Sequence, residues 1–226
     1  MSNFCRKNRI AFHCDGARIF EAAIGYNRDL AEIAQLFDTV YVSFYKGIGA
    51  ITGAMLLGSN NFCAEARIWS NRFGGNLYTF LPYALSCWSN FKKAWTKSEK
   101  SNNNLLTFTE KYKKLQNIVQ TLSNDDEISE WLTFDPCTPQ IGMIHCFIPR
   151  ATVSQCEMAK NIVFEKHAIK VFNRIRAIES KPFYPHESKG AFFELNIGQA
   201  NGRIPDKDFY RGWKAFAQVL AKIIND

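Results

Sequence analysis

Apolar residues in the first sixty positions form three short runs that polar residues separate. Residues 9–15 and 39–45 each contain such a run, and the second is rich in β-branched and aromatic side chains, as buried strands are. Between them, apolar residues recur at helical spacing, and Asn27 is placed to act as the N-cap of that helix. A third run, residues 54–58, predicts another strand. The pattern therefore indicates one βαβ unit, whose crossover keeps its two strands parallel and close.

The following segment, residues 61–97, has the pattern of helices. Gly74 and Gly75 interrupt this pattern and predict a helix end, and Pro82 fits the first turn of a second helix. Residues 97–104 (KSEKSNNN) are polar and of low complexity. We expect a loop there, at the boundary between two domains.

The second half of the chain alternates predicted strands with predicted helices. Apolar or alternating runs predict strands at residues 141–148, 170–178 and 192–197. Amphipathic spacing predicts helices at residues 105–122, at residues 151–167 and from Asp206 onward. This alternation predicts a small α+β sandwich with its helices on one face. We expect a first domain over residues 1–97 and this second domain over residues 105–226.

Composition narrows the classes of function. The 226 residues are 46% apolar, which is enough to bury a core, and the formal net charge is +7. The basic residues form no run of five or more and no known nucleic-acid motif, so we expect no nucleic-acid partner. The N-terminus lacks the apolar region of a signal peptide, and no stretch reaches the length of a membrane span. This favours a cytoplasmic protein with no membrane partner.

Cysteine and histidine spacing argues against two further kinds of site. The seven cysteines are an odd number without CxxC spacing, which argues against a disulfide framework and suits a reducing compartment. Cys14, Cys87 and Cys146 lie inside apolar runs, and we expect them to be small core residues. The four histidines show no metal-ligand spacing, so we expect no metal site.

Two charged residues are notable for their positions. Asp15 and Lys46 each fall at the C-terminal end of a predicted parallel strand, which is the edge of an open α/β sheet where ligands bind. A lysine amine can form a Schiff base with pyridoxal 5'-phosphate (PLP), and an aspartate can keep the pyridine nitrogen of that cofactor protonated. An Asp-Gly turn and a solvated lysine would give the same pattern. Spacing alone therefore leaves both interpretations open.

Four ordered motifs make the pattern more specific. They are residues 13–18 (HCDGAR), 46–49 (KGIG), 53–58 (GAMLLG) and 67–75 (RIWSNRFGG). Together they resemble the threonine aldolase and aromatic amino acid β-eliminating lyase family of fold-type-I PLP enzymes. The resemblance is strongest over residues 9–85. It implies an α/β fold in which a partial PLP-dependent transferase-like large domain precedes a small α+β C-terminal domain.

The resemblance also implies roles for five residues. Lys46 matches the lysine that holds PLP covalently, and Asp15 matches the partner of the pyridine nitrogen. Arg18 matches an arginine near the phenolic oxygen of the cofactor and the carboxylate of the substrate. His13 matches the histidine that orients this strand end, and Ser43 is a candidate phosphate ligand.

The chain departs from the family pattern at several positions. Tyr45 stands where the family more often has a serine, and Tyr78 stands where many members have an arginine that resembles a phosphate ligand. Residues 193–196 (FELN) lack the arginine that grips the substrate carboxylate in many members. Arg174 and Arg176 could replace it, although solvated arginines would show the same pattern. The departures leave room for an amino-acid substrate other than threonine.

The resemblance reaches only the later part of the large domain of the family. The Gly-rich phosphate loop and the aromatic residue stacked on PLP would precede residue 9, so we expect the chain to be incomplete relative to the family. Each phosphate contact at a helix N-terminus is worth about 1.5–3 kcal/mol. We therefore expect the chain by itself to bind PLP weakly.

Three hypotheses about function follow. The first is a PLP-dependent lyase or aldolase that acts on a β-hydroxy or β-substituted amino acid and forms a homo-oligomer through its helical segment, as the resemblance implies. The second is a non-catalytic remnant of that fold that associates with a partner. The third is an incomplete gene model of a full-length enzyme. The joint presence of Asp15 and Lys46 is the feature that bears on the first two hypotheses, because a remnant free of selection has no need to keep both, but one sequence leaves both hypotheses open.

Overall fold

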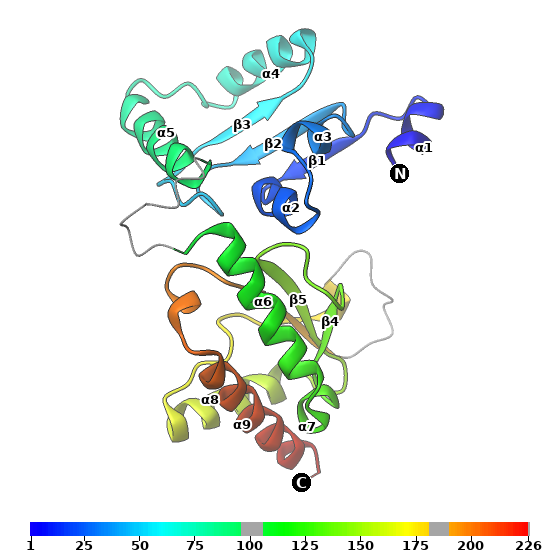
Figure 1. The fold of residues 1–226 in the computed structure, drawn as a ribbon, viewed down its shortest axis with the longest axis vertical. Coiled ribbons are helices and arrows are strands. Elements are labelled where there is room, and N and C mark those ends of the chain that lie inside the picture. The colour runs from blue at the N-terminus through cyan, green and yellow to red at the C-terminus, as the bar shows by residue number, and fades with distance from the viewer. Residues whose placement is uncertain (96–105, 181–189, 226) are drawn as a thin grey trace. The chain divides into compact units, whose positions relative to one another are not determined.

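The computed structural model describes residues 1–95, 106–180 and 190–225, and these form two compact units (Figure 1). Unit 1 is Met1–Phe108 and unit 2 is Thr109–Asp226. The polar loop predicted at residues 97–104 lies outside the described residues. Each unit has its own sheet and its own core.

Unit 1 contains a three-stranded sheet in the order β1-β2-β3. Its strands are β1 (His13–Gly16), β2 (Thr39–Ser43) and β3 (Ala54–Leu57). β1 and β2 are parallel, as the predicted βαβ unit requires, and β3 is antiparallel to β2. An added Cβ at Gly16 would lie 2.3 Å from the carbonyl oxygen of Tyr41. Only glycine therefore allows this approach of β1 to β2.

Three short helices accompany β1 and β2. They are α1 (Ser2–Lys7), α2 (Ile19–Gly25) and α3 (Leu30–Ala34). The predicted N-cap Asn27 is wrong, because Asp29 caps α3 in a capping box with Glu32 while Asn27 adopts a positive φ of 50°. The sequence pattern also missed α2, which is only seven residues long.

The core of unit 1 lies on one face of this sheet. Val40 and Val42 of β2 are buried there against Ile19 and Phe20 of α2 and against Phe108. Because side chains alternate along a strand, Tyr41 and Ser43 point to the opposite face. In the parallel register Asp15 lies opposite Tyr41, so this second face also carries Asp15.

Two longer helices complete unit 1, and both were predicted. α4 (Asn60–Arg72) begins at Ser59, whose hydroxyl accepts a hydrogen bond from the backbone N–H of Phe62, and it ends just before Gly74 at a positive φ. α5 (Leu81–Trp95) carries Pro82 in its first turn, where no intrahelical N–H bond is lost.

Unit 2 contains a four-stranded antiparallel sheet in the order β4-β5-β7-β6. The strands are β4 (Thr133–Asp135), β5 (Met143–Ile148), β6 (Arg176–Ala177) and β7 (Ala191–Asn196). The helices are α6 (Phe108–Ser123), α7 (Asp126–Ser129), α8 (Val153–His167) and α9 (Asp206–Asn225), with short 3₁₀ turns η1 (Ile178–Ser180) and η2 (Asn201–Arg203).

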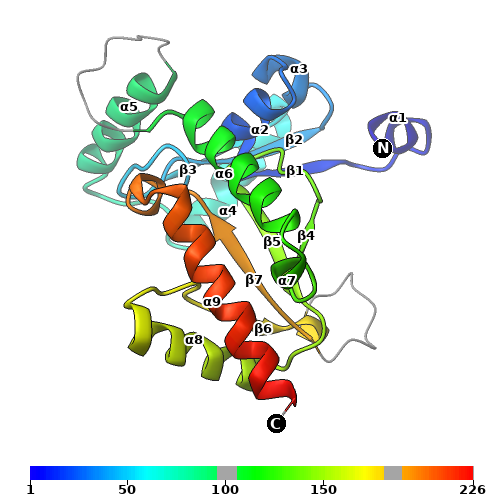
Figure 2. The same cartoon turned by 60° about the horizontal axis from the view of Figure 1, so that its bottom comes forward.

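The helices of unit 2 cover one face of its sheet, as the α+β prediction stated (Figure 2). Alternate residues of β5 and β7, such as Ile144 and Phe193, are buried against α6, α8 and α9. Trp213 of α9 stacks on Phe193 with ring centroids 5.1 Å apart. On the opposite face, Phe147 and Phe192 form a smaller cluster with Ile178.

The strand predicted over residues 170–178 is wrong for most of its length. Only Arg176 and Ala177 pair with β7. Upstream of them the chain places Phe172 in the core, where its ring packs on Phe193 at 5.4 Å and on Phe216 at 5.7 Å. Burial of this aromatic ring outweighs strand pairing there, which a period-two sequence pattern does not reveal.

Candidate active site

Asp15 lies on β1 of unit 1, one residue before the strand ends. Its carboxylate oxygen Oδ1 accepts a hydrogen bond of 3.1 Å from the backbone N–H of Ala17, a local contact that turns the chain toward α2. The side chain is exposed, and its register partner on β2 is Tyr41. The carboxylate thus stands on the face of the sheet opposite the core of unit 1.

Lys46 follows the C-terminal end of β2 and is also exposed. Its backbone N–H donates to the hydroxyl of Ser43 at 3.3 Å, and Ser43 is only 1% exposed. The ammonium group lies 5.9 Å from the centre of the Tyr45 ring. Since β1 and β2 are parallel, their C-terminal ends meet at one edge of the sheet, so Asp15 and Lys46 belong to the same edge.

His13 fixes the same pair of strands from the other end of β1. Its ring nitrogen Nδ1 shares a hydrogen bond of 2.7 Å with the hydroxyl of Thr39, its register partner on β2. One residue earlier, the backbone N–H of Phe12 donates to a carboxylate oxygen of Asp38 at 2.7 Å. These contacts hold β1 in register with β2 and thereby set the position of Asp15.

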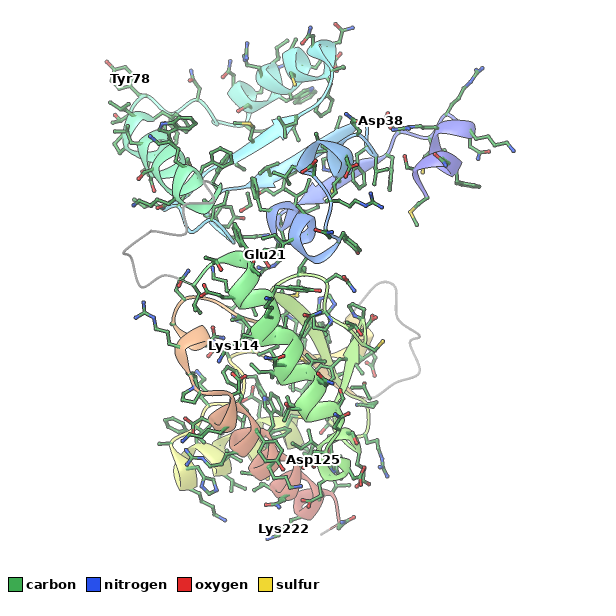
Figure 3. The ribbon with its side chains drawn as sticks, viewed as in Figure 1. Glu21, Asp38, Tyr78, Lys114, Asp125 and Lys222 are labelled. Carbon is green, nitrogen blue, oxygen red and sulfur yellow. The ribbon has the colours of Figure 1, made fainter. Side chains whose placement is uncertain are left out.

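Arg18 is the N-cap residue of α2 and is engaged by its own helix. Its guanidinium donates to the carboxylate of Glu21 at 2.9 Å, and Glu21 is 5% exposed (Figure 3). An added Cβ at Gly47 would lie 2.7 Å from the same carboxylate oxygen of Glu21. Glu21 therefore contacts both Arg18 and the loop that carries Lys46.

Two tyrosines beside Asp15 and Lys46 were not singled out from the sequence as site residues. The pKa of Tyr41 is raised, chiefly because its phenol shares a hydrogen bond with the phenol of Tyr45, with burial and the charge of Asp15 contributing less. The pair joins the strand face of Asp15 to the loop of Lys46. The pairing of β1 with β2 places residues 15 and 41 side by side. A correct alignment of the two predicted strands would therefore have pointed to Tyr41.

The structure also shows where the positions that depart from the family pattern lie. Tyr78, in the connection between α4 and α5, is fully exposed and points away from the ribbon (Figure 3). In unit 2, Phe193 is buried in the core, so that position of β7 presents no polar group. Arg174 and Arg176 are exposed at the edge of the unit 2 sheet.

The burial of the cysteines matches the prediction from the sequence only in part. Cys146 is fully buried in the core of unit 2, as predicted, whereas Cys14 and Cys87 are only half-buried. Among residues 1–95, 106–180 and 190–225, no three His, Cys, Asp or Glu side chains gather as metal ligands would. No helix in this part of the chain combines the length and apolar character that a membrane span needs.

The donor set of unit 1 suits a cofactor that carries an aldehyde and a basic ring nitrogen. An exposed amine can condense with the aldehyde, and an exposed carboxylate can pair with the protonated nitrogen. Ser43 is buried with its hydroxyl on the Lys46 loop, so it orients that loop. Arg18 keeps further guanidinium N–H groups besides the one that Glu21 receives.

The sequence model of the beta-eliminating lyase family matches residues 1–132. The low specificity L-threonine aldolase of Escherichia coli K12 is 36% identical over 74 residues, which are 33% of this chain and 22% of that enzyme. The low specificity L-threonine aldolase of Saccharomyces cerevisiae is 32% identical over 74 residues, or 33% of this chain and 19% of the yeast enzyme. The matched segment thus spans about a fifth of the length of these relatives.

Solved structures resemble the chain over nearly its whole length. A Listeria monocytogenes protein assigned as an L-allo-threonine aldolase has a TM-score of 0.74 at 27% identity, covering 96% of this chain and 54% of that one. A serine palmitoyltransferase of Sphingomonas wittichii has a TM-score of 0.63 at 12% identity, covering 100% of this chain and 51% of that one. The second likeness concerns the fold alone. The chain spans about half the length of these solved proteins.

Proposed function

Because the chain belongs to the beta-eliminating lyase family, whose cofactor is PLP, we propose that it forms part of a lyase acting on a β-hydroxy or β-substituted amino acid. The observation that carries this proposal is the placement of Asp15 and Lys46 at one edge of a parallel strand pair. The matched family region includes both residues. The threonine aldolase relatives support the amino-acid class of the substrate.

Lys46 is the residue that we assign to covalent attachment of the cofactor. Its amine is exposed, and the Ser43 hydroxyl holds its backbone at the end of β2. The Tyr45 ring lies beside the ammonium, 5.9 Å from it, in a cation–π contact. The amine of Lys46 would also be placed to carry a proton to or from the carbon that reacts.

Asp15 is the residue that we assign to the ring nitrogen. When PLP is bound, it withdraws electrons from the bond that breaks, and a carboxylate that keeps the nitrogen protonated strengthens this effect. Asp15 is oriented by the N–H of Ala17 and by the strand register that His13 secures. Tyr41, its register partner, lies between Asp15 and Tyr45 and helps position both groups.

Arg18 is a candidate for contact with the substrate carboxylate or the cofactor. The Glu21 carboxylate fixes one of its N–H groups, so the guanidinium is held in a single orientation. A fixed guanidinium suits recognition of a planar carboxylate better than a free one, because less side-chain entropy is lost on binding. We assign Glu21 as a positioning residue for Arg18.

Exposed apolar side chains on unit 1 support self-association as part of this function. Phe73, Leu77, Leu81, Leu85 and Trp88, on or next to α4 and α5, are each more than half exposed. Single exposed apolar residues are ordinary, but a group of this size favours a protein partner. The same observation supports the second hypothesis, a non-catalytic subunit that associates with a partner through this surface.

The test is to reduce the PLP complex of the chain with borohydride and to map the labelled peptide. We expect the phosphopyridoxyl label on Lys46, with loss of both the label and the visible absorbance band in Lys46→Ala. Lys93→Ala, which removes an exposed lysine of α5, is the matched control and keeps the label. Equal labelling of several surface lysines in protein that is folded by circular dichroism would rule out the assignment.

A second measurement separates catalysis from mere binding. The chain with bound PLP is incubated with threonine, allo-threonine and other β-hydroxy amino acids, and aldehyde release is followed. Asp15→Asn is expected to keep the label on Lys46 while it slows aldehyde release by at least about tenfold. A specific label on Lys46 without aldehyde release from any of these substrates would favour the non-catalytic subunit.

A further inference from the structure

Unit 2 contains a groove of about 710 Å³ that is lined by residues of this unit. One wall is the segment from Lys170 to Arg176, and the other is β7 from Phe192 to Asn196. β6 pairs with β7 only at Ala191 and Phe192, so beyond that point the two segments separate. Residues 198–201 and Phe209 close the end of the groove. We call this feature the basic groove.

Positive charge dominates the basic groove. Among the described residues that line it are Lys170, Arg174 and Arg176 and a single carboxylate, that of Glu194. Within the described part of the chain, no carboxylate lies within 4 Å of any of these three cations. Glu194 itself lies 3.8 Å from the ring of His145. The guanidinium groups are therefore available to an anion from solution.

The frame of the groove is well fixed. Asn201 accepts a hydrogen bond from the backbone N–H of Gly198 and donates one to the carbonyl of Asn196, both at 2.7 Å. Phe172 and Phe193 form its floor, where their rings stack on each other, and Phe193 also stacks on Trp213 of the core while Phe172 is tilted against it. A rigid floor under two arginines lowers the entropy cost of placing an anion there.

We propose that the basic groove is a binding site for a small organic oxyanion, that is, a carboxylate or phosphate group attached to a compact apolar body. Arginine presents paired N–H donors that match the oxygens of both groups. The volume suits a small molecule rather than a polymer. The apolar part of the ligand would meet Ile204 and Phe209. The site does not depend on the function proposed for unit 1.

The test is a calorimetric titration of the chain, without added PLP, at low salt with three ligands that share one ring. They are benzoate, phenyl phosphate and the neutral benzamide. We expect the two anions to bind and benzamide to bind at least about tenfold more weakly. A preference for benzoate would identify a carboxylate site, and a preference for phenyl phosphate would identify a phosphate site. Absence of binding by both anions up to about 10 mM, an affinity near 3 kcal/mol, would overturn the proposal.

Variants locate the binding in the groove. Arg174→Gln and Arg176→Gln are each expected to weaken binding about fivefold, since exposed charge-assisted contacts are partly screened by water. Glu194→Gln is expected to strengthen it about twofold because it removes the one carboxylate in the groove. If these residues had only a structural role, the arginine variants and Glu194→Gln would not change the affinity in opposite directions.

Two controls exclude other origins of the signal. Arg150→Gln removes another exposed arginine of unit 2, whose partner is Glu130, and should leave the affinity unchanged. Lys46→Ala should also leave it unchanged, so a failure of the unit 1 assignment would not affect this result. Unaltered affinity in the Arg174→Gln/Arg176→Gln double variant, with the fold verified by circular dichroism, would overturn the proposal.

Discussion

The guanidinium of Arg18 donates to the carboxylate of Glu21 across 2.9 Å, one turn later on the same helix. The pair is more than an ordinary surface contact, because Glu21 is 5% exposed and Arg18 is only 19% exposed. The same carboxylate packs against Gly47, the residue after Lys46. Glu21 thus couples the N-terminus of α2 to the loop that carries the candidate lysine.

Replacing Glu21 with glutamine should weaken this coupling. A charge-assisted hydrogen bond contributes about 1.5–3 kcal/mol, and the amide keeps the shape while it loses the charge, so we expect Glu21→Gln to lower the unfolding free energy by about 1–2 kcal/mol. Urea denaturation measures this change. Glu65→Gln, on the exposed surface of α4, is the control and should change the unfolding free energy by less than about 0.5 kcal/mol. Equal effects of the two variants would contradict the assigned role of Glu21.

A methyl group at Gly47 should disturb the same contact from the other side. Its Cβ would lie 2.7 Å from Glu21 and 3.1 Å from the ring of Phe108, and neither buried side chain can move away easily. We expect Gly47→Ala to cost about 1–3 kcal/mol, as overpacking does. Gly198→Ala, whose nearest contact would be 3.6 Å, is the matched control. A Gly47→Ala protein as stable as Gly198→Ala would show that this loop is loosely packed.

Asp125, the N-cap residue of α7, joins that helix to α9 (Figure 3). Its carboxylate receives hydrogen bonds from Lys214 at 2.8 Å and from Tyr210 at 2.8 Å, and Lys214 also lies 2.9 Å from Glu127. A hydrogen bond from Lys214 is the main cause that lowers the pKa of Asp125 and of Glu127. In turn, the hydrogen bond with Asp125 is the main cause that raises the pKa of Lys214. The cluster should therefore make stability depend on pH.

The sign of this pH dependence follows from the lowered pKa of the two carboxyls and the raised pKa of Lys214. Carboxyls with a lowered pKa stabilise the fold above their ordinary value near pH 4, and this contribution is lost as pH falls through their pKa in the folded protein. The raised pKa of Lys214 keeps its contribution up to about pH 10. Lys214→Gln should therefore lower the melting temperature by several degrees at pH 7 and much less at pH 2.5. Lys222→Gln, elsewhere on α9, should not show this difference between the two pH values.

Thiol reactivity should separate the cysteines of unit 2 by burial. Burial is the main cause that raises the pKa of Cys156 to about 12, with the charge of Glu157 adding to it, and burial raises the pKa of Cys146 as well. At pH 8 both thiols stay protonated and shielded, so a disulfide exchange reagent should label the exposed Cys137 first. Peptide mapping checks the order. Labelling of Cys156 before Cys137 in the native protein would contradict the packing of α8.

The sequence by itself specified the parts of this protein that rest on local patterns. Alternation and β-branched content located β2, and helical spacing with Gly74 and Pro82 located α4 and α5. The ordered motifs around Asp15 and Lys46 identified the family before any geometry was known. The roles of the five candidate site residues remain predictions.

Only the tertiary structure decided the contacts between segments distant in sequence. The hydrogen bond from Arg18 to Glu21 is local, but the burial of Glu21 against Gly47 depends on how β2 and its loop pack on α2. The segment around Phe172 alternates like a strand, yet it leaves β7 because the ring gains more from burial against Phe193 than its backbone would gain from pairing. The basic groove exists for that reason. Packing energies of this kind depend on partners that a periodic pattern does not contain.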